Sequence, residues 1–107
     1  MALPAGLREL LFSRCKGYCE KCGFSLDPET ADFHHRKLRS RGGEDTPQNG
    51  ILVHHKCHLQ HKDSIHDNPK KAKEMGWMCP SWQDPLECRL ILSNGKSVKL
   101  TPEGTYA

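Results

Sequence analysis

The sequence predicts a small α+β protein whose short helices and strands are held together by more than a hydrophobic core. Leucines recur at helical spacing near the N-terminus, whereas the aliphatic run 51–53 and the turn Asn94-Gly95 between two apolar stretches indicate strands. Only 36% of the 107 residues are hydrophobic, so the core is thin and an added cross-link is expected. The six cysteines and seven histidines could supply it as disulfides or as a metal site.

The expected elements follow from these patterns and from the residues that begin and end them. Gly17 and Gly23 bracket a tight turn, and Asn68-Pro69 and Gly76 have the residue types that begin and end a helix. We expect one domain, 1–107, with a core at 15–66 and a C-terminal extension at 67–107. In chain order, we predict a helix at 4–14, strands at 31–36 and 51–53, helices at 57–65 and 70–75, and hairpin strands at 88–93 and 96–101.

The N-terminal segment and the length of the apolar runs indicate in which cellular compartment the protein is expected. Residues 1–12 lack the basic start, long apolar stretch and small-residue cleavage site of a secretory signal, and no stretch is apolar for long enough to span a bilayer. We therefore expect a cytoplasmic protein. In a reducing compartment, paired Cys and His residues favour a metal site over disulfides.

Two short motifs with the same spacing could bind one zinc ion. Cys19-x2-Cys22 can direct two thiolates to one point, and His54-x2-Cys57 has the same gap. Together they form a Cys3His set without a position for water, which is typical of structural zinc. The alternatives are a pair of reduced buried thiols at Cys19 and Cys22, or Cys15 in place of one ligand. Two further cysteines, Cys79 and Cys88, have no neighbouring pair and are expected in the core.

Between the two motifs lies a set of residues suited to phosphodiester hydrolysis. That reaction needs a base for water, a cation for the developing charge, and a group that holds the base in place. Neutral imidazoles can supply the base and the metal ligands near neutral pH. The sequence offers His34-His35, then Asn49, then His58 directly after Cys57.

The order Cys-x2-Cys, His-His, Gly-Gly, Asn, His-x2-Cys-His resembles the zinc-containing HNH, or ββα-metal, endonucleases. The resemblance covers roughly residues 19–65 and implies two antiparallel strands and a helix that hold one divalent ion (Mg²⁺, Mn²⁺, Ni²⁺ or Zn²⁺). It implies that His34, in a position usually occupied by Asp, and His58 bind this ion. It further implies that His35 is the general base and Asn49 braces the loop and orients the base. Replacing Asp by His34 disfavours Mg²⁺ relative to the softer ions, and His61 and His66 are candidates for an additional contact.

Basic residues surround this set. Between His34 and Lys73 there are nine lysines and arginines but four acidic residues, which favours a polyanionic partner over an unpartnered basic loop. The side chains expected to contact DNA phosphates, with weak sequence specificity, are Arg36, Lys37, Arg39, Arg41 and Lys62.

Residues 67–85 loosely resemble the C-terminal part of small phage-encoded HNH proteins. This resemblance implies a role in phage DNA processing or packaging, with the terminase as a partner, in a bacterial or phage-infected cell. We expect a monomer or a weak dimer. The alternatives to an endonuclease are a non-catalytic zinc module that binds nucleic acid and a protein whose main role is contact with the terminase.

Overall fold

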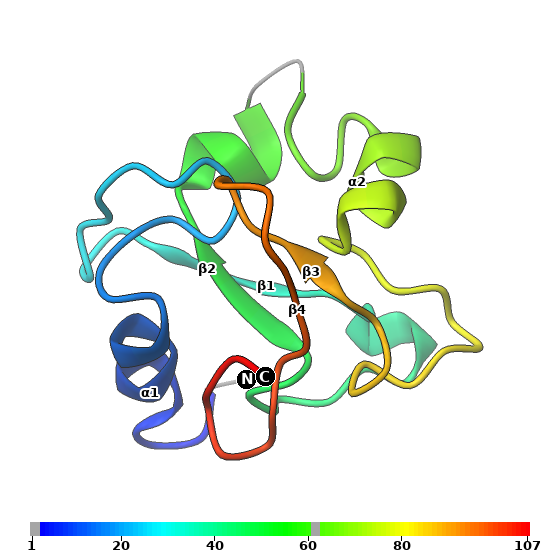
Figure 1. The fold of residues 1–107 in the computed structure, drawn as a ribbon, viewed down its shortest axis with the longest axis horizontal. Helices are drawn as coiled ribbons and strands as arrows, with labels where there is room; N and C mark the ends of the chain where they lie inside the picture. Colours follow the sequence, from blue (N-terminus) through cyan, green and yellow to red (C-terminus); the bar gives the residue numbers. More distant parts are fainter. Residues whose placement is uncertain (1–2, 61–62) are drawn as a thin grey trace.

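Two small antiparallel sheets and several short helices make up residues 3–60 and 63–107, which the computed structural model describes (Figure 1). This confirms the α+β class. Strand β1 pairs with β2, and β3 pairs with β4. In chain order, the elements are α1 (Leu7–Arg14), β1 (Asp32–His35), a 3-10 turn (Arg39–Arg41), β2 (Gly50–Val53), a π-helical turn (Lys56–Gln60), α2 (Pro69–Met75), β3 (Leu90–Ile91) and β4 (Ser97–Val98).

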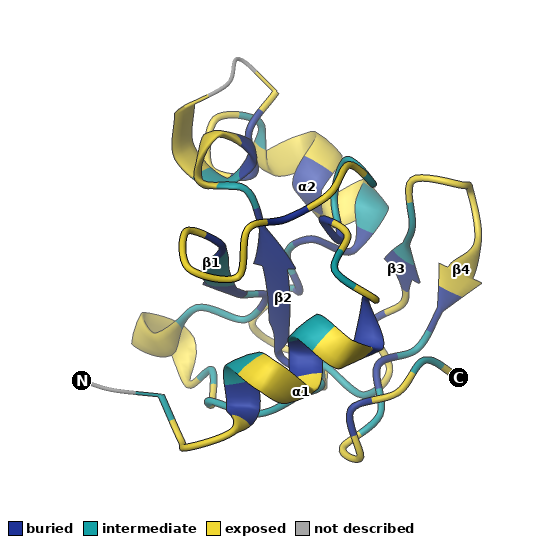
Figure 2. Ribbon diagram, turned by 90° about the vertical axis from the view of Figure 1, so that its left-hand side faces the viewer, coloured by how far each residue is buried: buried dark blue, intermediate teal, exposed yellow. Residues whose placement is uncertain are grey.

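Strand β2 forms the centre of the core and is buried along its whole length (Figure 2). Its partner β1 runs antiparallel to it, with Asp32 opposite Val53 and His35 opposite Gly50. Helix α1 packs against β2 through Leu11. The helix starts at Leu7, three residues later than predicted, because Gly6 has a φ of 81° and the Leu7 N–H closes a turn onto the Pro4 carbonyl.

The predicted helix at 57–65 is shorter in the structure. The helical turn ends at Gln60, and the chain then folds back so that the Ile65 N–H donates to the Cys57 carbonyl at 2.9 Å. The His66 N–H likewise donates to the His58 carbonyl at 3.3 Å. Two predicted site residues, His61 and Lys62, lie outside the described residues. These hydrogen bonds hold Ile65 and His66 next to the start of the turn. A continuous helix would have carried them away from it.

The C-terminal extension has the predicted helix and hairpin. The Asn68 side chain accepts a hydrogen bond from the Lys71 N–H at the start of α2, and Gly76 ends the helix with a φ of 78°. The hairpin closes at Asn94-Gly95, where Leu92 donates to Lys96 at 2.8 Å, but each paired strand has only two residues. Trp77, Leu90 and Leu100 belong to the same hydrophobic cluster as β2. The extension therefore packs into the core.

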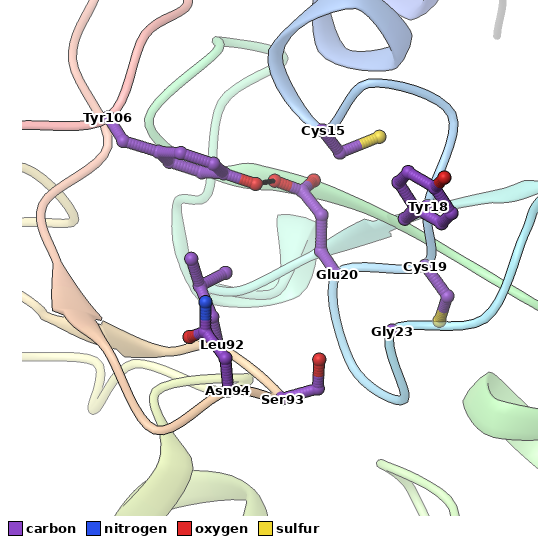
Figure 3. A pocket seen from close by; sticks show the side chains of 9 residues that line it. All are labelled: Cys15, Tyr18, Cys19, Glu20, Gly23, Leu92, Ser93, Asn94 and Tyr106. Carbon is purple, nitrogen blue, oxygen red and sulfur yellow. Dashed lines mark hydrogen bonds between the residues drawn. The ribbon is translucent and has the colours of Figure 1, made fainter.

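The end of the chain is joined to the turn that carries Cys19. Arg14 and Glu20 form a buried ion pair at 2.7 Å, and the Tyr106 hydroxyl donates to Glu20 at 2.7 Å. Figure 3 shows Tyr106 and Glu20 at a cavity of about 270 Å³ between this turn and the loop at Ser93 and Asn94. Burial and the Glu20 carboxylate raise the pKa of Tyr106, which therefore stays a neutral donor. No helix among residues 3–60 and 63–107 is long and apolar enough to cross a membrane.

The structure corrects the prediction that Arg36 contacts DNA phosphates. Arg36 is fully buried, and its guanidinium donates to backbone carbonyls instead of facing solvent. Its Nε donates to Gly76 at 2.8 Å and its Nη1 to Gln48 at 3.0 Å, and Nη2 donates to Cys88. The forked guanidinium donates to carbonyls from both the extension and the loop before β2. Arg36 therefore ties the extension to the end of β1.

We predict that Arg36→Ala lowers the free energy of unfolding by about 3–5 kcal/mol, because it leaves buried carbonyls without donors and opens a cavity. Arg36→Lys should restore little of this, since an ammonium cannot reproduce the fork. Urea unfolding of both variants measures the effect, with exposed Arg41→Ala as the control. A loss below about 1 kcal/mol for Arg36→Ala would contradict the role given to its hydrogen bonds.

Candidate active site

Four predicted zinc ligands come together where the turn before β1 meets the turn after β2. The ligand atoms of Cys19, Cys22, His54 and Cys57 all lie within 4.8 Å of one another. His54 Nδ1 is 3.3 Å from Cys22 Sγ, while His54 Nε2 is 2.8 Å from the Ser25 carbonyl. The carbonyl fixes the proton on Nε2, so Nδ1 faces the sulfurs with its lone pair. This set could bind zinc.

The thiols of this cluster also fit a metal. Backbone N–H groups of Lys21 and Cys22 point at Cys19 Sγ from 3.4 Å, an arrangement suited to a thiolate. Without an ion, burial raises the pKa of Cys19 and raises that of Cys57 to about 12. A bound cation would reverse this and release the protons. Of the alternatives, Cys15 lies outside the set; its Sγ instead faces the Phe12 carbonyl at 3.5 Å.

A second cluster consists of three histidines. His34 Nδ1 lies 3.2 Å from His58 Nε2, which in turn lies 3.1 Å from His66 Nε2. His34 comes from β1, His58 from the π-helical turn, and His66 from the segment that folds back onto that turn. One ligand atom from each lies within 4.8 Å of the others, which is close enough for one ion.

The outer hydrogen bonds of this cluster indicate which nitrogen atoms carry protons. His34 Nε2 is 2.7 Å from the Trp77 carbonyl, and His58 Nδ1 is 3.0 Å from an Asp32 oxygen. Both partners are acceptors, so each of these nitrogens carries the proton, and the lone pairs of His34 Nδ1 and His58 Nε2 face each other. Two lone pairs at 3.2 Å repel unless a cation or a proton lies between them. The donor set therefore fits a divalent metal.

Burial keeps His34 in the form that a metal requires. Burial, together with the nearby His58, lowers the pKa of His34 to about 3. Burial also lowers the pKa of His66, with His58 adding to the effect. At neutral pH both imidazoles are therefore unprotonated at one nitrogen and can coordinate.

Asp32 holds His58 from outside the cluster. Its Oδ2 accepts hydrogen bonds from His58 Nδ1 at 3.0 Å and His55 Nδ1 at 2.8 Å. Burial alone would raise the pKa of the Asp32 carboxyl, but these hydrogen bonds outweigh it and lower the pKa. The carboxylate therefore stays ionised, which orients His58 and increases its basicity as a ligand.

We predict that Asp32→Asn weakens metal binding by the histidine cluster about 10- to 100-fold. The ring of His58 keeps its place, but it loses the charge that fixes its tautomer. Calorimetric titration of zinc-loaded protein with Mn²⁺ or Ni²⁺ measures the affinity. Asp45→Asn, a carboxylate outside the cluster, is the matched control. Equal affinities in Asp32→Asn and the wild type would contradict the orienting role.

His35 points to the other face of β1 from His34, because successive side chains alternate along a strand. Its Nε2 is 2.7 Å from Asp45 Oδ1, and Asp45 also pairs with Arg39 at 2.7 Å. The hydrogen bond from His35, with Arg39 in support, lowers the pKa of Asp45. Arg39 Nε also approaches His35 Nε2, at 3.3 Å, but the shorter contact with the carboxylate places the proton on Nε2 and leaves the lone pair on Nδ1. His35, Arg39 and His58 line one open pocket of about 320 Å³.

Residues 19–64 match the sequence model of a family described as HNH endonuclease. This match agrees with the resemblance to HNH endonucleases seen in the sequence. The matched segment includes the Cys3His set, His34, His35, Asn49 and His58, whereas His66 lies two residues beyond it. Comparison with curated proteins and with solved structures gave no match.

Within the matched segment, Asn49 is buried and holds the loop that follows His35. Its Oδ1 accepts from the Lys37 N–H at 2.7 Å, and its Nδ2 donates to the Lys37 and Glu44 carbonyls. The carboxylate that contacts His35 belongs instead to Asp45, the next residue of this loop after Glu44. Asn49 can thus influence the position of His35 indirectly, through the loop that carries Asp45.

The other described residues that were predicted to contact DNA lie around this loop. Arg39 and Arg41 are exposed in the 3-10 turn, and Lys37 is partly exposed before it. Arg39 is paired with Asp45 beside His35.

Sequence reasoning missed three groups, namely Asp32, Asp45 and the Trp77 carbonyl. Asp32 could have been predicted, because residues 32 and 34 of a strand point to the same face. The other two depend on how the loop and the extension fold.

Proposed function

We propose that this chain is a metal-dependent DNA endonuclease that hydrolyses phosphodiester bonds with weak sequence specificity. The observation that carries the proposal is the shared pocket: His35, with a free Nδ1, and His58, from the metal-type cluster, line the same open surface. A base and a ligand of the cation site on one surface would supply two of the groups that phosphodiester hydrolysis requires. The match of residues 19–64 to HNH endonucleases supports the same conclusion.

In this proposal, β1, β2 and the turn at Lys56–Gln60 form the ββα-metal core, and His34, His58 and His66 hold the ion. A divalent ion bound there would stabilise the negative charge that develops on the phosphate and the leaving oxygen. His35 Nδ1 would take a proton from water, while Asp45 holds the ring and stabilises the imidazolium. Lys37, Arg39 and Arg41 would contact neighbouring phosphates.

The extension belongs to the same working unit in this proposal. Trp77, from the segment 67–107, supplies the carbonyl that fixes the tautomer of His34. We therefore propose that residues 1–107 act as one domain, with the Cys3His set binding a structural zinc. The association with phage DNA packaging and a terminase remains part of the proposal and rests on the resemblance of the tail.

Plasmid cleavage by the purified protein tests the enzyme activity, with Mg²⁺, Mn²⁺, Ni²⁺ and EDTA compared. We expect metal-dependent nicking or linearisation. His35→Ala should lower the rate by about 10²- to 10⁴-fold, which is the usual contribution of a general base. The variant should still bind two metal ions per chain, which shows that it is folded.

Two results would contradict the proposal. A folded, zinc-loaded wild type that cleaves with none of these metals would leave the non-catalytic nucleic-acid-binding module or the terminase-contact protein. Cleavage at the wild-type rate by His35→Ala would remove His35 from the mechanism.

A further inference from the structure

The two tryptophans of the chain have opposite environments. Trp77 is 3% exposed and packs in the core, whereas Trp82 is 82% exposed. A ring of this size in water loses the free energy that burial would provide, so it favours a partner that covers it.

Trp82 stands between two pockets. One, of about 370 Å³, has an apolar floor that includes Leu38 and Met78, and its rim carries the exposed Arg41 and Lys73. Among the described residues that line this pocket there is no carboxylate. The other, of about 340 Å³, is lined by Lys37 and Gly42-Gly43 but also by the acidic Glu44 and Asp84, so the first pocket is the better site for a phosphate. An apolar floor with a cationic rim fits a flat base attached to a phosphate.

The surface around Trp82 is attached to the end of β1, the strand that carries His35. The Cys79 N–H donates to the carbonyl of Arg36, the residue after His35, at 2.8 Å. Leu38 and Arg41 belong to the turn that directly follows. A nucleic-acid strand that reaches His35 could therefore continue along this turn to Trp82.

We propose that Trp82 stacks on an unpaired nucleobase of the DNA substrate while Arg41 and Lys73 bind the flanking phosphates. Bases within a duplex are already stacked on both faces, so a base that stacks on Trp82 must come from a single-stranded, gapped or flipped-out region. The inference rests on the proposed function and narrows it: the substrate class is DNA with unpaired bases near the scissile bond.

Intrinsic fluorescence can test this inference directly, because the only other tryptophan, Trp77, is buried. The probes are a short single-stranded oligodeoxynucleotide, the same strand with abasic sites, and the blunt duplex, added to zinc-loaded protein without a second metal. We expect the single strand to quench the fluorescence and bind more tightly than the other two. In a parallel anisotropy assay, Trp82→Ala should weaken single-strand binding by roughly 5- to 150-fold, the range for one stacked base.

Two variants serve as controls. Trp82→Phe keeps an aromatic face and should retain most of the affinity. Phe24→Ala removes a side chain that is 73% exposed near the zinc ligands, and it should leave single-strand binding unchanged. Loss of affinity in Trp82→Ala but in neither control supports stacking.

Equal binding of normal and abasic strands, or unchanged single-strand affinity in Trp82→Ala, would overturn the inference. The latter is also the result expected if Trp82 contacts a protein partner. If the wild type nonetheless cleaves plasmid DNA with metal, the proposed function survives that result. If the wild type neither binds nor cleaves DNA, both proposals fail.

Discussion

Replacing Cys57 by Ala is expected to unfold the protein. Its thiol is buried in the Cys3His set that joins the turn before β1 to the turn after β2. Structural zinc sites contribute about 10–16 kcal/mol in small zinc-binding peptides. A domain is stable by only about 5–15 kcal/mol. Loss of one ligand from four therefore removes an amount comparable to the whole stability.

Circular dichroism, thermal unfolding and zinc content per chain measure this effect, and a strong zinc chelator added to the wild type should reproduce it. Cys15→Ala is the matched control, because Cys15 is a buried thiol outside the set. It should cost about 0.5–3 kcal/mol, as an ordinary core substitution does. A zinc-free Cys57→Ala variant that melts within a few degrees of the wild type would instead support the alternative of reduced, metal-free thiols.

The local patterns of the sequence predicted much of this fold because they depend on neighbouring residues. The cap at Asn68, the stop at Gly76 and the turn at Asn94-Gly95 are determined by backbone chemistry within a few residues. The Cys19 and His54 motifs lie together, as their equal spacing, which suits the ligands of one tetrahedral ion, predicted. These features require no knowledge of the tertiary structure.

The errors arose where long-range contacts decide the outcome. Arg36 lies in a basic segment and is of a residue type that often contacts DNA phosphates. In the structure, however, carbonyls from three distant parts of the chain surround it. His66 was a candidate for an additional contact, but the helix predicted at 57–65 would have carried it away from His58. In the structure, the Ile65 and His66 N–H groups donate to the Cys57 and His58 carbonyls, which brings His66 to His58. No local signal in the sequence specifies that return.

His58→Ala is expected to abolish the second metal site and to slow DNA cleavage strongly. His58 is the central ligand, 3.2 Å from His34 Nδ1 and 3.1 Å from His66 Nε2, so its loss leaves no continuous set of three. Metal content should fall from two ions per chain to one, with the Cys3His zinc retained. Cleavage should fall by roughly 10³-fold, because a metal ion supplies several kcal/mol of charge stabilisation.

His55→Ala is the matched control for this change. His55 donates to the same Asp32 carboxylate at 2.8 Å, but its side chain is 52% exposed and lies outside the cluster. It should keep two ions per chain and the wild-type rate. If His58→Ala also kept both ions, the close approach of the three imidazoles would have to reflect a shared proton, and the metal that cleavage requires would have to bind elsewhere.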